Sequence, residues 1–310
     1  MSAGLPLVLP RPLEKGCTVG VCAPAGPVDD AALDAGLAWL EAAGYAPRCA
    51  PHLRSRSGFL AGRDDERAAD LVQLLRDPEV RGIVLARGGY GLSRILGRLT
   101  PLELRTARKL MVGYSDATAL LLLLQRRAGL ASVHGPMLER PELSDEARAR
   151  WLAVVRGEPG AFEPLRGNGL REGRVRGPLV GGNLTALASS LGTPWELDAR
   201  GAILFLEEVC EEPYAIDRMV VQLREAGKLC DVAGVAIGQL VSCSSTRYPE
   251  PTAREVLREL LMRVFEGPIV EDLPFGHVHD HRALGFGVRA ELDGSRGTLT
   301  MLDPVVEVDG

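Results

Sequence analysis

The stretch VGYSDATALLLLLQ, residues 112–125, begins as a short apolar run typical of a buried strand and continues as a strongly apolar helix. Ser115 stands at the turn between the two, with the small residue Gly113 two positions before it and Ala117 two positions after it. In open sheets of parallel strands, chemistry sits where strands end and helices begin. The stretch therefore indicates a layered α/β fold and makes Ser115 a candidate functional residue.

The same alternation of strands and helices runs through the first half of the chain. Short apolar strands separated by amphipathic helices are typical of a mostly parallel sheet flanked by helices on both faces. The expected strands are 18–24, 46–51, 82–91 (which runs into a glycine-rich loop) and 109–114, and the expected helices are 29–45, 62–80 and 116–127.

A change in composition suggests two domains. Residues 158–178 are rich in Gly, Pro and Arg and show little periodicity, which is typical of a crossing between domains. We expect an N-terminal α/β domain at 1–157, a linker at 158–176 and a C-terminal domain at 177–310. Expected in the last are strands at 202–208 and 232–240, helices near 214–227 and 252–265, and a hairpin at 288–302 with Asp293-Gly294 as its turn.

The composition narrows the class of protein. Of 310 residues, 46% are hydrophobic and 25% are charged, as in ordinary globular proteins, and the net charge of −5 offers no basic field for nucleic acid. No apolar run reaches the roughly 18 residues of a membrane-spanning helix, and Met1–Lys15 lacks the pattern of a secretory signal. Because the cysteines form no C-x-x-C pair, we expect reduced thiols in a cytoplasmic protein. They are Cys17, Cys22, Cys49, Cys210, Cys230 and Cys243.

Two interpretations of Ser115 remain open on this motif alone. A sharp turn from strand to helix lifts one side chain out of the fold, as in the G-x-S-x-G elbow of other hydrolases, and the pattern here is G-x-S-x-A. Serine is also among the best residues for capping a helix N-terminus. Ser115 is thus either a nucleophile or a helix cap.

The loop in LARGGYG, residues 85–91, favours the nucleophile. A Gly88-Gly89 peptide lets an N–H group approach a substrate carbonyl without a blocking Cβ atom. Together with the N–H group of Asp116, it would form an oxyanion hole. The alternative is a phosphate-binding or merely tight turn, but the loop lacks the G-x-G-x-x-G spacing and no Walker lysine accompanies it.

A serine nucleophile needs a base and an orienting carboxylate. Three of the five histidines fall in FGHVHDH, residues 275–281, and His277 follows Phe275-Gly276 at a position from which a loop can aim it. The alternating histidines could suggest a metal, but no H-E-x-x-H or cysteine ligand supports one. Glu207 and Glu208 end an expected buried strand, where acids commonly form a solvated strand end but could instead face a cleft.

At this point the sequence resembles the LD-carboxypeptidases, the muramoyl-tetrapeptide carboxypeptidase family of serine peptidases. The resemblance covers nearly the whole chain and implies a smaller, β-rich C-terminal domain and a homodimer. It rests on five motifs in order: ARGGYG (86–91), GYSDATALL (113–121), GPLVGGNLTAL (177–187), LFLEEVCEEPYAIDRMVVQL (204–223) and PFGHVHD (274–280).

The resemblance also implies roles for individual residues. Ser115 would be the nucleophile, His277 the general base and Glu207 its orienting acid, while the N–H groups of Gly89 and Asp116 would form the oxyanion hole. The chain has LEE where the family more commonly has LED, which leaves the register between Glu207 and Glu208 open. His279 and His281 are additions to the family pattern.

The implied activity is release of the terminal D-Ala from murein tetrapeptides in peptidoglycan recycling, with no metal or cofactor and with neither nucleic acid nor membrane as a partner. One alternative is hydrolysis of an aminoacyl-nucleotide amide, as in microcin C immunity proteins, which share these motifs. A second alternative is a non-catalytic module that binds murein peptides.

Overall fold

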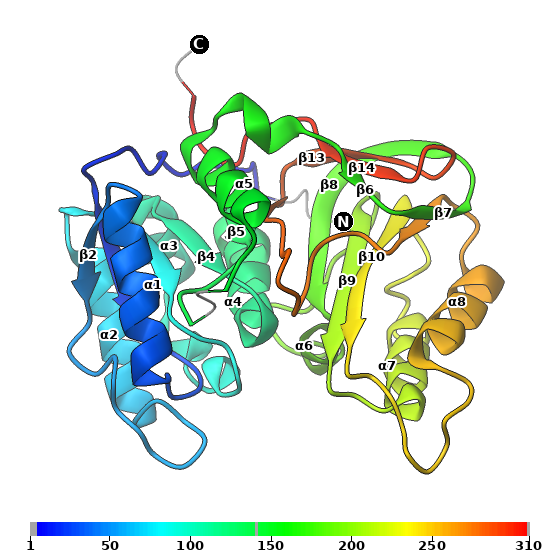
Figure 1. Cartoon of the computed structure of the whole chain (residues 1–310), viewed down its shortest axis with the longest axis horizontal. Coiled ribbons are helices and arrows are strands. Elements are labelled where there is room, and N and C mark those ends of the chain that lie inside the picture. The colour runs from blue at the N-terminus through cyan, green and yellow to red at the C-terminus, as the bar shows by residue number, and fades with distance from the viewer. Residues whose placement is uncertain (1–4, 140–141, 309–310) are drawn as a thin grey trace. The chain divides into compact units, whose positions relative to one another are not determined.

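The computed structural model describes residues 5–139 and 142–308, and the chain divides into two compact units (Figure 1). Unit 1 contains the chain through Ala161, the segment Arg282–Gly287 and the chain from Pro304 onward. Unit 2 contains Phe162–His281 and Val288–Asp303. Each unit is built around its own sheet, as expected for an α/β protein with a second, strand-rich part.

The sheet of unit 1 has six strands in the order β12-β5-β4-β3-β1-β2. Five strands run parallel, and β12 pairs antiparallel with β5 at the edge. The mostly parallel sheet predicted from the sequence is therefore confirmed. Its strands are β1 (Thr18–Cys22), β2 (Ala46–Cys49), β3 (Val80–Leu85), β4 (Leu110–Gly113), β5 (Ser132–His134) and β12 (Leu284–Phe286).

The strand order of unit 1 reverses between β1 and β3. The chain moves outward from β1 to β2 and then returns past β1 to β3, so the loops after β1 and β3 leave the sheet in different directions. In doubly wound sheets the ligand crevice lies outside the carboxyl ends of the strands at this reversal. The glycine-rich loop follows β3, and Ser115 follows β4, its neighbour in the sheet.

The helices of unit 1 are placed by their apolar faces. On one side, α1 and α5 meet through Trp39 and Trp151, whose ring centroids lie 5.1 Å apart in an edge-to-face arrangement (Figure 1). The expected helix 116–127 consists of a 3₁₀ turn η3, a short helix α4 and a π-helical turn η4. The segments are α1 (Asp30–Ala42), α2 (Asp64–Arg76), α3 (Pro101–Ala107), η3 (Ser115–Ala117), α4 (Thr118–Leu123), η4 (Leu124–Ala128) and α5 (Asp145–Arg156).

Unit 2 is built on an eight-stranded mixed sheet in the order β6-β14-β13-β8-β9-β10-β11-β7, with β8 to β11 parallel. The helices are α6 (Leu184–Ser189), α7 (Pro213–Glu225) and α8 (Ala253–Val264). The strands are β6 (Leu165–Arg166), β7 (Asn168–Arg171), β8 (Arg174–Asn183), β9 (Ile203–Val209), β10 (Gly234–Val241), β11 (Ile269–Glu271), β13 (Arg289–Asp293) and β14 (Thr298–Met301).

Segment 158–176, expected as a linker, contains β6, β7 and the start of β8. Its glycines allow close backbone approach: a Cβ atom at Gly169 would collide with the carbonyl oxygen of Gly294. The low periodicity of this segment thus reflects crowded sheet-edge strands rather than an open connection.

Two details at the end of the chain also differ from expectation. Residues 282–287 belong to unit 1 because β12 pairs with β5, and the residues from 304 onward also belong to it, with the N–H group of Glu307 donating to the carbonyl oxygen of Pro10. The hairpin of β13 and β14 is confirmed, but its loop spans 294–297 rather than turning at Asp293-Gly294. No helix in the described part of the chain is long and apolar enough to cross a membrane.

Candidate active site

The backbone of Ser115 has a φ of +61°, in the left-handed region that residues with a Cβ atom rarely occupy. Such a conformation costs on the order of 1–3 kcal/mol and persists where the surrounding structure imposes it. The small neighbours make the turn possible, because a Cβ atom at Gly113 would lie 2.8 Å from the Cβ atom of Ala117. Ser115 is not a helix cap, since Tyr114 and Ala117 occupy the N-cap positions of η3 and α4.

The glycine-rich loop after β3 lies directly against Ser115. A Cβ atom at Gly88 would lie 3.0 Å from the Cβ atom and 3.1 Å from the Oγ atom of Ser115. Gly89 has a φ of +97°, which favours glycine. The N–H group of Gly26, in the loop after β1, donates a 2.8 Å hydrogen bond to the carbonyl oxygen of Gly88. The loops on either side of the strand-order reversal are thereby joined.

Asp116 connects the turn at Ser115 to the far end of the same loop. Its Oδ2 atom accepts a 2.8 Å hydrogen bond from the backbone N–H group of Leu92. Burial raises the pKa of the Asp116 carboxyl to about 6, although this hydrogen bond and the charge of Arg67 act in the opposite direction. The side chain thus positions the loop, whereas the backbone N–H group of Asp116 is the candidate oxyanion donor.

Sequence reasoning overlooked Arg87 and Glu139, which brace the base of the loop. The Nε atom of Arg87 lies 3.0 Å from the Oε2 atom of Glu139, and its guanidinium donates a 2.5 Å hydrogen bond to the carbonyl oxygen of Pro27. Glu139 donates its backbone N–H group to Ala86 and accepts from the N–H group of Asp29. The one feature of the sequence that could have indicated this role is the position of Arg87 within the motif ARGGYG.

In unit 2, His277 and Glu207 form a buried pair. The Nδ1 atom of His277 lies 2.7 Å from the Oε2 atom of Glu207, whose side chain is fully buried. Gly276 has a φ of +114°, and a Cβ atom there would lie 3.1 Å from the Cβ atom of Glu207. A glycine before the histidine is therefore required for this close approach. The ring of Phe275 packs edge-to-face on Phe205, with centroids 5.8 Å apart.

Glu208 has a different environment from its neighbour, because adjacent side chains of a strand point to opposite faces. Its carboxylate accepts hydrogen bonds from the Nδ2 atom of Asn183 (2.7 Å), from the N–H and hydroxyl groups of Thr185 (2.7 and 2.8 Å) and from the N–H group of Val209 (2.8 Å). Burial raises the pKa of Glu208. Both glutamates are buried, so the interpretation that they form a solvated strand end is wrong.

The predicted site residues fall into two groups. In unit 1, Ser115 lies against the Gly88-Gly89 loop; in unit 2, Glu207 contacts His277. The two additional histidines differ in their environment: His279 is exposed and His281 is buried. Among residues 5–139 and 142–308, no cluster of three or more His, Cys, Asp or Glu side chains could hold a metal ion.

The segments that carry the serine, the glycine loop and the histidine–glutamate pair fall within matches to two domain models of one family. Residues 19–135 match the model of the LD-carboxypeptidase N-terminal domain, and residues 176–292 match that of the C-terminal domain. The chain belongs to the LD-carboxypeptidase family.

Several LD-carboxypeptidases are similar over nearly their whole length. A probable murein peptide carboxypeptidase of Bacillus subtilis is 36% identical over 93% of this chain and 92% of its own. The murein tetrapeptide carboxypeptidase of Pseudomonas aeruginosa is 32% identical over 90% and 94%. The crystal structure of muramoyltetrapeptide carboxypeptidase from Oxalobacter formigenes matches with a TM-score of 0.81 at 31% identity, covering 91% of this chain and 97% of that one.

A more distant relative is the microcin C7 self-immunity protein of Escherichia coli, 24% identical over 97% of this chain and 98% of its own. Its structure with aspartyl sulfamoyl adenosine has a TM-score of 0.86 at 22% identity, which shows the shared fold.

Proposed function

We propose that this LD-carboxypeptidase family member is a serine carboxypeptidase that releases the terminal D-Ala from murein tetrapeptides. The observation that carries the proposal is Ser115, held in a left-handed conformation against a glycine loop, in a chain whose His277 is paired with the buried Glu207. The names of the relatives supply the substrate class.

The proposed mechanism is acyl transfer with Ser115, His277 and Glu207 in the roles of a serine-peptidase triad. The Nδ1–H group of His277 donates to Glu207, so the Nε2 atom carries the lone pair that accepts the Ser115 proton. Ser115 attacks the carbonyl carbon of the bond to D-Ala, and the N–H groups of Gly89 and Asp116 stabilise the developing oxyanion. His277 then protonates the departing amine. Water attacks the acyl-enzyme with His277 again as base.

The proposal also covers the contribution of each part of the chain, the cellular location and the oligomeric state. The N-terminal part supplies the nucleophile and the oxyanion donors, and the C-terminal part supplies the glutamate and the histidine. We propose that the enzyme acts in the cytoplasm, in recycling of cell-wall peptides, and works as a homodimer. Sedimentation equilibrium of the purified chain tests the last point, and a single monomeric species would contradict it.

Ser115→Ala tests the central claim. Loss of a triad nucleophile costs about 10⁶-fold in kcat, so turnover of a purified murein tetrapeptide should fall to near the limit of detection. Ser93→Ala, at an exposed serine in the 3₁₀ turn Leu92–Arg94 that follows Gly91, is the matched control and should keep full activity. Wild type should be labelled by a fluorophosphonate and Ser115→Ala should not. Retention of more than about a tenth of the wild-type rate by Ser115→Ala would exclude the serine mechanism.

The microcin-type hydrolase is the principal rival. The higher identity to the murein carboxypeptidases, 36% and 32% against 24%, supports the peptidase. Parallel assays on a murein tetrapeptide and on an aminoacyl sulfamoyl adenosine separate the two. Faster turnover of the nucleotide analogue would favour the rival, and binding of the peptide without turnover would favour a non-catalytic module.

A further inference from the structure

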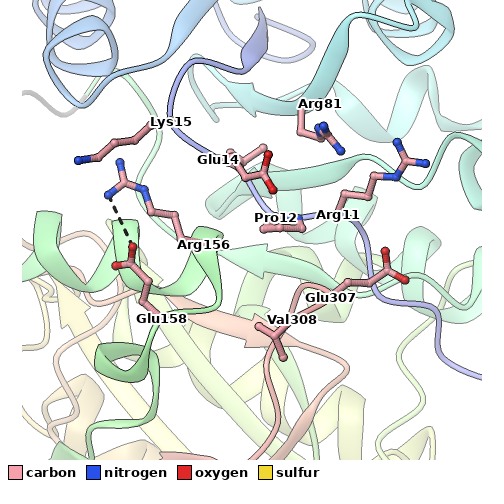
Figure 2. Close-up of a pocket in the computed structure, with 10 residues that line it drawn as sticks. Arg11, Pro12, Glu14, Lys15, Arg81, Arg156, Glu158, Glu307 and Val308 are labelled. Carbon is pink, nitrogen blue, oxygen red and sulfur yellow. Dashed lines mark ion pairs between the residues drawn. The ribbon is translucent and has the colours of Figure 1, made fainter. Parts of the chain in front are cut away.

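A cavity of about 530 Å³ lies in unit 1 at the amino-terminal edge of the parallel sheet (Figure 2). Lys15 lies three residues before the first residue of β1, and Arg81 is the second residue of β3. Gly88 and Ser115 lie beyond the carboxyl ends of β3 and β4, and the six-residue β3 alone spans about 20 Å. The cavity is therefore separate from the candidate catalytic residues of unit 1.

The charges around this cavity do not balance. Arg11, Lys15 and Arg81 form no ion pair with any residue that the structure describes. Of the carboxylates lining the cavity, that of Glu307 forms a hydrogen-bonded ion pair with Arg108, which lies outside the cavity. Figure 2 shows the side chains in two groups, Lys15 and Arg156 on one side and Arg11 and Arg81 on the other, with Glu14 between them.

Arg11 and Arg81 also line a second cavity of about 330 Å³. The other charged groups of that cavity have partners: Asp77 and Glu79 bind Arg48, and Arg76 binds Glu103. The ammonium group of Lys109 donates to backbone carbonyl oxygens. Two guanidinium groups without carboxylate partners thus stand where the two cavities meet, in a chain with a net charge of −5.

One cation of the cavity, Arg156, is held in place by hydrogen bonds within the chain. Arg156 donates 2.9 Å hydrogen bonds to the hydroxyl oxygen of Tyr45 and to the carbonyl oxygen of Ala43, while Glu158 lies 3.9 Å away. The backbone of Arg81 is held within β3. Pro12 and Val308 add apolar surface. A volume of this size suits a small organic ligand rather than a lone inorganic ion.

The geometry points to a binding site for a small phosphorylated organic molecule, with its phosphate between Arg11 and Arg81. Planar guanidinium groups donate several parallel hydrogen bonds to phosphate oxygens, which is why paired arginines favour phosphate. Lys15 and Arg156 face the far side of the ligand, and Glu14 accepts a hydrogen bond from one of its hydroxyl groups. This site goes beyond the proposed function and does not depend on it.

Calorimetric titration of the full chain with glucose 6-phosphate, pyrophosphate and uncharged glucose tests the proposal. We expect saturable binding of both phosphate compounds, weakened by added salt, and none of glucose. Tighter binding of glucose 6-phosphate than of pyrophosphate supports an organic ligand. Absence of saturable binding of either phosphate compound, or equal binding of glucose, overturns the proposal.

Substitutions at the lining residues should change the affinity for phosphate compounds in a predictable direction. Arg11→Gln and Arg81→Gln should each weaken phosphate binding about tenfold, because each removes charge-assisted hydrogen bonds. Glu14→Gln should strengthen pyrophosphate binding, since it removes a negative charge facing the anion. The matched control is Arg98→Gln, at an exposed arginine of unit 1 outside both cavities, and it should bind as wild type does.

Two outcomes contradict the assignment even if phosphate binds. One is unchanged affinity in both arginine variants, which would place the anion elsewhere. The other is equal weakening by Arg98→Gln, which would indicate non-specific attraction. Peptide hydrolysis serves as an independent readout: Arg11→Gln and Arg81→Gln should keep the wild-type rate, so failure of the binding site and failure of the proposed enzyme are distinguishable.

Discussion

Glu207 and Glu208 are adjacent residues of β9 and both are buried, yet they have different partners. Glu207→Gln should lower kcat about 10⁴-fold, because an orienting acid fixes the tautomer of its histidine. Glu208→Gln should lower kcat less than about tenfold. It should instead lower the free energy of unfolding by about 1–3 kcal/mol, because its amide N–H₂ group would face hydrogen-bond donors. Steady-state kinetics and urea unfolding separate the two effects, and the reverse ranking in kcat would make Glu208 the triad acid.

Asp116 gives a prediction with a pH window. Its pKa in the folded chain is about 6, above the ordinary value of 3.8, so the folded state binds the proton more tightly than the unfolded state does. The protonated Asp116 carboxyl therefore adds to the free energy of unfolding, and this contribution is fully present below about pH 4. It is lost as the pH rises through about 6, a loss on the order of 3 kcal/mol. Asp116→Asn cannot ionise and keeps an oxygen for the N–H group of Leu92.

The measurement for Asp116 is urea unfolding of wild type and Asp116→Asn across this pH range. The variant should gain stability relative to wild type between about pH 4 and pH 7. Comparing the difference between the two proteins cancels the titration of all other groups. If the difference in the free energy of unfolding between the two proteins stays constant with pH, the pKa of the Asp116 carboxyl is not raised in the folded chain.

At the scale of elements, the loop after β3 must approach Ser115 without side chains. Gly88→Ala introduces a Cβ atom 3.1 Å from the Oγ atom of Ser115, and Gly89→Ala imposes a positive φ on a residue with a Cβ atom. We expect each change to reduce kcat at least about tenfold, because small displacements of catalytic groups are costly. Gly97→Ala, where a Cβ atom meets nothing within 4 Å, is the control. Wild-type kinetics in Gly88→Ala would separate the loop from catalysis.

The strands β1 to β4 and the helices α1 and α2 could be predicted because local patterns determine them, whereas α3, β5 and α5 were not predicted. Buried strands such as β3 are short apolar runs, and Asp29 caps α1 by accepting a hydrogen bond from the N–H group of Ala32. The motif residues could be found for the same reason, since small residues flank Ser115 where the backbone is tight. The bracing by Arg87 and Glu139 could not, because it joins side chains 52 positions apart in sequence.

The strands β6, β7 and β12 were missed for another physical reason. They contain two to four residues, and their pairing partners are distant in sequence: Leu284 pairs with His134 and Val270 with Gly169. A strand this short carries too few residues to show an alternating pattern. Its existence depends on an edge that another part of the chain presents.

At the scale of the whole molecule, unit 1 is completed by residues from the far end of the chain. β12 extends its sheet, and the N–H group of Glu307 donates to the carbonyl oxygen of Pro10. Burial of a large aliphatic or aromatic side chain contributes about 1.5–3 kcal/mol. Four such fully buried side chains therefore contribute an amount comparable to the usual net stability of a domain, about 5–15 kcal/mol. They are Leu284, Phe286, Val305 and Val306.

A fragment of residues 1–161 should consequently fail to unfold cooperatively in urea. It contains Trp39 and Trp151, whose edge-to-face contact makes their fluorescence a probe of unit 1. The control is the full chain with Trp195→Phe, in which the same two tryptophans report and a cooperative transition is expected. Without β12, the fragment also leaves β5 as an open edge, so aggregation should rise with concentration. If the fragment unfolds at the same urea midpoint as the control, the late segments do not stabilise unit 1, and the N-terminal sheet is a self-sufficient folding unit.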